Sequence, residues 1–184
     1  MKFIRTKLDG VIIVEPDVYR DDRGFFLETF RTDGYAKGGI CLNFVQDNQS
    51  RSSRGTIRGL HAQRKRPQGK LVRVLSGSIA DVVVDIRRGS PGYLQWIAVE
   101  LSAENFRQIY VPPGFAHGIC IISEFADVAY KCTDYYDPSD ELRIAWNDAA
   151  IGIEWPVEDP TLSPKDRTAA GISDLEEFLP LYRG

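Results

Sequence analysis

The sequence predicts an all-β sandwich or barrel with only a few short helices. Short stretches rich in Val, Ile, Phe and Tyr recur along the chain, and clusters of Gly, Pro, Asp and Asn separate them. Within residues 70–74 the polar Lys70 and Arg73 are interspersed with apolar residues, and the alternation from Val72 to Val74 is the period of a strand with two different faces. Many short strands at close spacing are typical of two packed antiparallel sheets or of one closed sheet.

The individual elements follow from these stretches and from the breaks between them. We expect strands at residues 11–14, 24–30, 42–46, 56–61, 70–75, 79–86, 95–101, 108–111, 118–122, 127–133 and 142–146. Helical patterning is confined to single turns near residues 32–36 and 103–106 and to a short segment at residues 173–178. Residues 155–164 are rich in Pro and Asp, so we expect an extended arm over the surface.

Length and composition are those of one soluble globular domain, residues 1–184. No apolar run is long enough to span a membrane, and residues 1–10 lack a secretion-signal pattern. Cys41, Cys120 and Cys132 are widely spaced without a CxxC pair, which predicts reduced thiols in a cytoplasmic protein. Cys120 or Cys132 could be a nucleophile, but inert burial in a strand is favoured.

Positive charge is concentrated in one part of an acidic chain. The formal net charge is −3, yet every charged residue from 48 to 80 is Arg or Lys. A local cationic segment on an acidic protein predicts a confined anionic ligand and argues against a nucleic-acid surface. Arg58, His61 and Lys70 lie within this segment. Residues 58 and 61 of a regular strand point to opposite faces, so we expect a distortion at Gly59 if both serve one site.

The second histidine lies in the pattern PxGxxH, formed by Pro112, Gly114 and His117. This pattern resembles the second motif of the cupin superfamily, whose small jelly-roll barrels often bind a metal inside. The first cupin motif is HxH followed by Glu, but here Gln63 stands two residues after His61 and no third histidine exists. Because a metal site needs three or four suitable ligands, we expect a metal-free cavity lined by acid–base groups. His117 has either a role in that cavity or a structural one.

Charged and aromatic side chains share residues 21–30. Taken alone, this pattern favours an edge strand protected by charge. The alternative is that Arg23 and Glu28 face a ligand or a partner subunit.

The segments RGLH, QGKLVRV, DVVVDIR, RQIYVPPGFAHG, YKCTDYYDP and LSPKD, in this order, resemble the dTDP-4-dehydrorhamnose 3,5-epimerase family. The resemblance runs from DRGFFLETF to LSPKD near residue 166. It implies a jelly-roll (cupin) fold with few short helices, a homodimer without metal or nicotinamide cofactor, and a role in deoxysugar biosynthesis. One departure is Ala62, where many members carry an aromatic residue.

The resemblance also implies a substrate and a reaction. The substrate would be a dTDP-4-keto-6-deoxyhexose, epimerised at C3 and C5, the two carbons whose C–H bonds the C4 ketone acidifies. Such a reaction needs a base, a group that holds the enolate oxygen, and an acid on the opposite face. By resemblance His61 is the base and Asp166 orients it, while Lys70 meets the oxyanion and Tyr130 is the acid.

The remaining implied contacts are with the substrate's other groups. Arg58 would hold the diphosphate and His117 would lie near the sugar. Gln46 and Asn48 would hydrogen-bond the substrate. Either Tyr135 or Tyr136 would stack on the thymine. Arg23 and Glu28 would contact the nucleotide of a partner subunit through an exchanged N-terminal strand. The motifs leave several alternatives open: a C3-only or C5-only monoepimerase, a 3,4-ketoisomerase, or a non-catalytic nucleotide-sugar-binding cupin. Tyr130 favours a double or C5-active epimerase.

Overall fold

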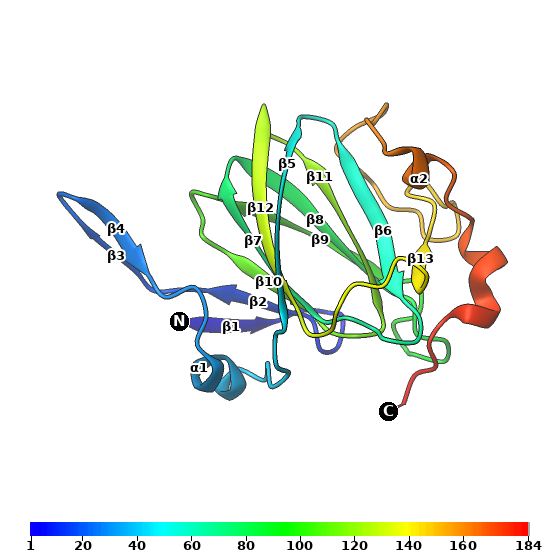
Figure 1. Ribbon diagram of the computed structural model, residues 1–184, viewed down its shortest axis with the longest axis horizontal. Helices are drawn as coiled ribbons and strands as arrows, with labels where there is room; N and C mark the ends of the chain where they lie inside the picture. The colour runs from blue at the N-terminus through cyan, green and yellow to red at the C-terminus, as the bar shows by residue number, and fades with distance from the viewer. Residues whose placement is uncertain (184) are drawn as a thin grey trace.

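The computed structural model describes residues 1–183, and two antiparallel sheets packed face to face form its body (Figure 1). One sheet has the order β1 (Lys2–Arg5), β2 (Ile12–Glu15), β10 (Gln108–Val111), β7 (Lys70–Ser76), β12 (Phe125–Cys132) and β5 (Gln46–Ser53). The other has the order β13 (Glu141–Arg143), β6 (Ile57–Gln63), β11 (Phe115–Ile121), β8 (Ser78–Asp85) and β9 (Trp96–Ser102). Strands distant in sequence lie side by side in both sheets, as in a jelly roll, so the all-β prediction is confirmed.

Helices are short, as predicted. The chain forms α1 (Thr32–Lys37), α2 (Pro164–Arg167) and the 3-10 helix η1 (Ile172–Phe178), and residues 103–105 form a turn. Helix α2 was not predicted; its N-cap is Ser163, with a proline at the first helical position. No helix within residues 1–183 is long and apolar enough to cross a membrane.

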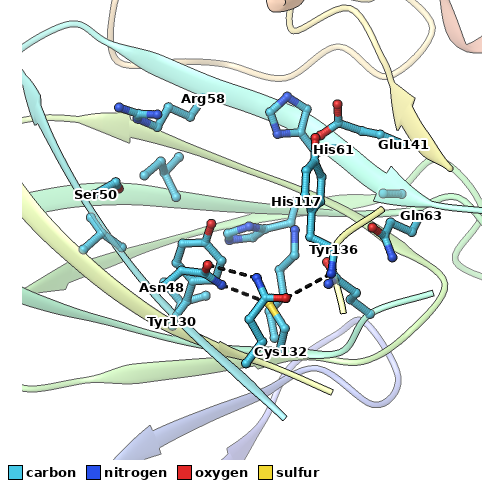
Figure 2. Close-up of a pocket in the computed structure, with 17 residues that line it drawn as sticks. Asn48, Ser50, Arg58, His61, Gln63, His117, Tyr130, Cys132, Tyr136 and Glu141 are labelled. Carbon is cyan, nitrogen blue, oxygen red and sulfur yellow. Dashed lines mark hydrogen bonds between the residues drawn. The ribbon is translucent and has the colours of Figure 1, made fainter. Parts of the chain in front are cut away.

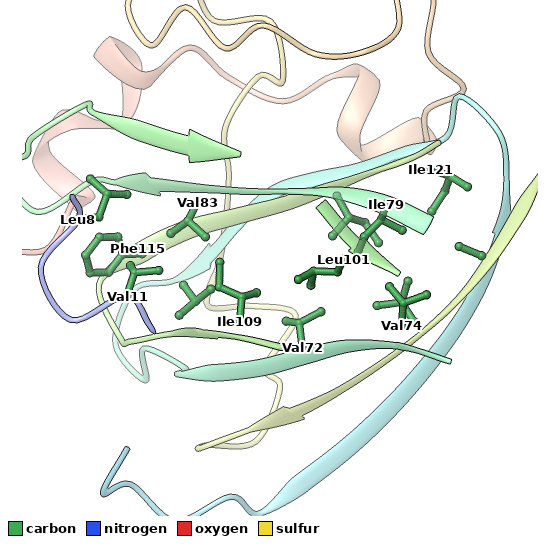
Figure 3. Packing of buried hydrophobic residues seen from close by; sticks show 14 residues of the cluster. Leu8, Val11, Val72, Val74, Ile79, Val83, Leu101, Ile109, Phe115 and Ile121 are labelled. Atoms are coloured by element: carbon green, nitrogen blue, oxygen red, sulfur yellow. The ribbon is translucent and has the colours of Figure 1, made fainter. Parts of the chain in front are cut away.

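The main apolar core fills one part of the space between the sheets (Figure 3). It contains Val72 of β7, Val83 of β8 and Leu101 of β9, all fully buried. Strand alternation explains the pattern, because one face of each strand meets the opposing sheet. Val72 and Val128 belong both to this core and to the wall of a polar cavity. The core therefore supports one side of that cavity.

Near the N-terminal part of the chain, one strand was predicted in the wrong place and another was not predicted. The strand expected at residues 42–46 begins only at Gln46 and continues to Ser53, and β1 was missed. Polar side chains occupy both faces of β5, whose sequence is QDNQSRSS, so no apolar alternation marks it. The inner face of this strand is polar because alternate residues line the polar cavity and not the apolar core.

The single strand expected at residues 24–30 is instead half of a hairpin, β3 (Val18–Asp21) and β4 (Gly24–Leu27). The hairpin pairs with neither large sheet and projects away from them, so the edge-strand interpretation is corrected (Figure 1). The hairpin contacts the body at Phe106, whose ring lies 4.8 Å from that of Phe25 and 5.3 Å from the guanidinium carbon of Arg20. Tyr19 and Phe26 remain 65% and 70% exposed. Exposed aromatic side chains on a projecting element are typical of an interaction surface.

Candidate active site

A cavity of about 310 Å³ opens between the two sheets (Figure 2). Eight of the predicted site residues line it: Gln46, Asn48, Arg58, His61, Lys70, His117, Tyr130 and Tyr136. The other polar residues of its wall were not among the predicted site residues: Ser50, Gln63, Gln68, Cys132 and Glu141. Strand alternation could have found Ser50 and Cys132, since each lies two residues after a predicted neighbour. Glu141 comes from β13, and no local pattern announces it.

The distortion expected in β6 is present. Gly59 has a φ of 130°, the Gly59–Leu60 peptide is cis, and the register with β11 shifts between His117 and Ile119. Arg58 and His61 consequently reach the same cavity. A Cβ atom on Gly59 would lie 2.6 Å from the Gly118 Cα, so the backbones of β6 and β11 leave no room for a side chain.

Replacing Gly59 with Ala is expected to lower the free energy of unfolding by about 2 kcal/mol or more, through backbone strain and the collision with β11. Urea unfolding measures this change. Gly89→Ala is a matched control, because Gly89 has a φ of 83° but nothing within 4 Å of an added Cβ. The control should lose less than Gly59→Ala, and equal losses would show that the contact with Gly118 is unimportant.

His61 forms a short hydrogen bond with Asp166 of α2. The Nε2 of His61 lies 2.6 Å from the Oδ1 of Asp166. Burial raises the pKa of Asp166, but hydrogen bonds from His61, Ser163 and the Gly59 backbone outweigh it, so the pKa falls below its usual value. The carboxylate is therefore ionised at neutral pH and accepts from Nε2–H. The lone pair on Nδ1 of His61 is therefore available to accept a proton.

The arm at residues 155–164 explains how Asp166 reaches His61. As predicted, it is extended and irregular, and its only bridge within residues 1–183 joins Thr161 to Thr56. Thr161 also exchanges backbone hydrogen bonds with Gly55 and Ile57, at the start of β6. The arm therefore delivers α2 to the outer side of the strand that carries His61.

Lys70 of β7 is enclosed by the cavity wall. Burial lowers the pKa of its ammonium below the ordinary lysine value, and the nearby Cys132, Asp81 and Glu141 oppose this shift. No hydrogen bond or ion pair within residues 1–183 engages the ammonium beyond these longer-range attractions. Its three donors are therefore available to an anionic oxygen in the cavity.

Tyr130 projects from β12, in the sheet opposite to that of His61. In Figure 2 the two side chains lie on different sides of the cavity. Burial is the largest cause that raises the pKa of the Tyr130 phenol, so the hydroxyl keeps its proton at neutral pH. A proton acceptor and a proton donor thus reach the same space from opposite layers.

A second His–Asp pair lies in the same cavity. The Nε2 of His117 lies 2.9 Å from both carboxylate oxygens of Asp81, a fully buried residue of β8. His117 was a predicted site residue, whereas Asp81 was not. Nothing in the order of the chain signals this pairing, because only the antiparallel ladder of β8 and β11 brings the two residues together.

The structure separates Tyr135 from Tyr136. Tyr136 lines the cavity, and its backbone N–H donates to the Gln46 Oε1 over 3.0 Å. Tyr135 is 58% exposed and does not line the cavity. Within one protomer, therefore, Tyr136 is in place to contact a substrate in the cavity and Tyr135 is not.

Arg23 and Glu28 do not reach the cavity of their own chain. Arg23 pairs with Asp21 on the projecting hairpin, and Glu28 lies 3.3 Å from Arg31. Their predicted contact with a partner's nucleotide therefore stays a prediction.

The thiols of the cavity region are poor nucleophiles. All three cysteines are unpaired, and Cys120 and Cys132 are buried. Burial raises the pKa of Cys120 to about 11 and also raises that of Cys132, which suits the inert role that was favoured. Within residues 1–183, no three His, Cys, Asp or Glu side chains are grouped as metal ligands.

Fold and cavity together define the class: a cupin-type jelly roll whose interior carries paired acid–base side chains. The family model for dTDP-4-dehydrorhamnose 3,5-epimerase matches residues 5–174. The chain belongs to this family.

Individual relatives agree with the family model. The dTDP-4-dehydrorhamnose 3,5-epimerase of Methanothermobacter thermautotrophicus is 52% identical over 97% of this chain and 98% of its own. The enzyme of the same name from Pseudomonas aeruginosa is 48% identical over 97% and 99%. A crystal structure of a dTDP-6-deoxy-D-glucose-3,5-epimerase from Legionella pneumophila, in complex with dTDP-4-keto-L-rhamnose, has a TM-score of 0.96. It is 49% identical and covers 100% of this chain and 99% of its own.

Proposed function

We propose that the protein epimerises a dTDP-4-keto-6-deoxyhexose at C3 and C5, as an isomerase of dTDP-L-rhamnose-type deoxysugar biosynthesis. The observation that carries the proposal is the placement of His61 and Tyr130 on opposite sheets around one cavity. Inversion at carbon requires removal of a proton from one face and delivery to the other, and these two residues meet that requirement. The names of the relatives supply the substrate.

The proposed steps use only side chains of the cavity. Nδ1 of His61 takes the proton beside the C4 ketone, and the ionised Asp166 stabilises the imidazolium that forms. The ammonium of Lys70 stabilises the negative charge that develops on the C4 oxygen. Tyr130 then delivers its phenolic proton to the opposite face of the same carbon. Solvent removes the proton from His61 and returns one to Tyr130, and the cycle repeats at the second carbon. No metal or redox cofactor enters this sequence.

The remaining polar residues of the cavity are proposed to bind the substrate. Arg58 is assigned to the diphosphate; its Nε donates to the Ser52 Oγ over 2.8 Å, which leaves the terminal nitrogens to face oxygens of the ligand. Gln46 and Asn48 are joined by a 3.0 Å hydrogen bond and offer further donors and acceptors to the sugar nucleotide. Tyr136 is the better candidate to stack on the thymine, because it borders the cavity.

We also propose that the protein works as a cytoplasmic homodimer that exchanges its hairpins. The exposed aromatic residues of β3–β4 support this arrangement, and so does a second hollow of about 380 Å³ beside Arg73 and Lys131, on the outer face of the six-stranded sheet. Arg23 and Glu28 would then approach the partner's nucleotide. Light scattering should give a dimer mass, and a monomer would contradict this part of the proposal. The unpaired thiols support a reducing compartment.

Solvent exchange tests the reaction. Incubating the protein with dTDP-4-keto-6-deoxyglucose in deuterated water should place deuterium at both C3 and C5. Label at one carbon only would identify a monoepimerase, and a 3-keto product would identify a ketoisomerase. Binding of the nucleotide sugar without label or product would leave a binding protein and would contradict the proposed function.

Replacing Lys70 with Met is expected to raise stability while it lowers epimerisation by about 10²-fold or more. The folded-state pKa of Lys70 lies below its unfolded value, so between the two values the unfolded chain binds more protons and stability rises with pH. Below both values the unfavourable burial of the charge is fully present, and Met removes it. We expect a Tm increase of about 2–4 °C at pH 7 for each kcal/mol regained.

Lys7→Met is the control for this prediction, because Lys7 is exposed. It should change neither the Tm nor the rate. A lower Tm for Lys70→Met than for the unmodified protein would show that the ammonium is held by favourable contacts in the folded state.

A further inference from the structure

The two His–Asp pairs of the cavity lie directly opposite each other on neighbouring strands. His61 of β6 and His117 of β11 are partners in the antiparallel register. Side chains in this relation have Cβ atoms about 4.5–5.5 Å apart, and like charges there repel. A state with both imidazoles charged is therefore unfavourable, so at most one of them is expected to carry a charge. The surroundings of the two carboxylates decide which histidine is charged.

Asp166 has several donors besides His61. The backbone N–H of Gly59 and the hydroxyl of Ser163 both hydrogen-bond its carboxylate and help to keep it ionised. Its negative charge is therefore partly compensated when His61 is neutral and donates only through Nε2–H. This pair does not require a charged histidine.

Asp81 has no such help. Its side chain is fully buried, and both of its oxygens lie 2.9 Å from the same nitrogen of His117. Within residues 1–183, His117 is the one hydrogen-bond donor to this carboxylate. A buried carboxylate is strongly unfavourable unless it is paired with positive charge, so Asp81 favours the protonated form of His117.

The other groups around His117 are consistent with this assignment. On β12, Tyr130 and Cys132 are neutral, because burial raises the pKa of both. On β7, Lys70 is a second cation, and the negative charge of Asp81 attracts it as well. Two further groups border the cavity on the side of β6 and β13, Arg58 and Glu141, and Glu141 lies 3.4 Å from the Nε of Arg143.

We propose that Asp81 holds His117 as an imidazolium, so that His117 and Lys70 together stabilise the enolate oxygen while His61 stays neutral and acts as the base. Asp81 does not line the cavity and acts through His117, which makes it a positioning residue. The charge assignment stands on the burial and the hydrogen bonds of the two pairs, whereas its catalytic consequence rests on the proposed epimerase function. In this arrangement the His61–Asp166 pair removes a proton, whereas the His117–Asp81 pair stabilises negative charge.

Nitrogen NMR of the imidazole rings tests the charge assignment on the unmodified protein. Because the chain contains two histidines, His61→Asn suffices to assign both sets of resonances. At pH 7.5 we expect both ring nitrogens of His117 to carry protons. His61 should be neutral, with its proton on Nε2. A neutral His117 at this pH would overturn the inference.

Asp81→Asn tests the catalytic consequence. It should make His117 neutral and lower deuterium incorporation at C3 and C5 about 10- to 100-fold, with the affinity for dTDP unchanged. The matched control is Asp85→Asn, also on β8, whose buried carboxylate is held by Arg87 and Ser90. The control should lower stability but leave the His117 signals and the exchange rate unaltered.

The outcomes separate the two proposals. Unchanged exchange in Asp81→Asn with a neutral His117 would overturn the role of the imidazolium in catalysis. If Asp81→Asn does not fold, the NMR measurement on the unmodified protein still decides the charge of His117. A charged His117 in a protein that exchanges no substrate protons would support the charge assignment and contradict the epimerase function.

Discussion

Replacing His61 with Asn is expected to lower epimerisation at C3 and C5 together by about 10³-fold, within the range that a positioned general base contributes. Both carbons should be affected, because they flank one ketone and Nδ1 of His61 is the free imidazole lone pair aimed at the cavity. The shorter Asn side chain does not reach the position of Nε2, but Asp166 keeps the hydrogen bonds from Ser163 and the Gly59 backbone, which limits the disturbance of the fold. The measurement is deuterium incorporation at each carbon, followed by proton NMR.

The affinity for dTDP provides the internal control for this variant. Arg58, Gln46 and Asn48 are unchanged, so nucleotide binding should persist within a few-fold while exchange is lost. Loss of exchange at only one carbon would show that a second base serves the other. Such a result would reject the single-base mechanism but leave the location of the active site intact.

The sequence allowed most of the fold to be predicted, because most strands place apolar residues against the opposing sheet. The alternation around Val72 and the run through Val83 are examples, and both residues are fully buried. The prediction failed at β5, where the cavity replaces the core and polar side chains occupy both faces. It also failed at β1 and at the β3–β4 hairpin, where aromatic residues point to solvent in the protomer.

The candidate site was predictable where chemistry is concentrated in short segments. The cationic stretch led to Arg58, His61 and Lys70. Because residues 58 and 61 of a regular strand point to opposite faces, a distortion at Gly59 could also be predicted. Asp166 and Tyr130 were found only through the resemblance to a family. Asp81 and Glu141 were missed, since ladders between distant strands bring them to the site and a single sequence carries no record of such ladders.

Replacing Tyr130 with Phe is expected to separate proton exchange from inversion. His61 remains able to remove the proton, and the Lys70 ammonium still holds the enolate, so deuterium should enter the substrate from the face of His61. Inversion should fall by about 10²- to 10⁴-fold, because no acid on the opposite sheet returns a proton. Phe fills the same space, so packing against Val72 and Val128 should change little.

The experiment compares the deuterium content of recovered substrate with the amount of epimerised product. Tyr110→Phe is the control, because Tyr110 is a buried tyrosine outside the cavity, and burial raises its pKa to about 12. It should leave both exchange and inversion intact. If Tyr130→Phe inverts both carbons at the normal rate, a different donor, such as Cys132 or water, protonates the far face. If it loses exchange as completely as His61→Asn does, deprotonation itself depends on the phenol, and the division of the two steps between opposite sheets is wrong.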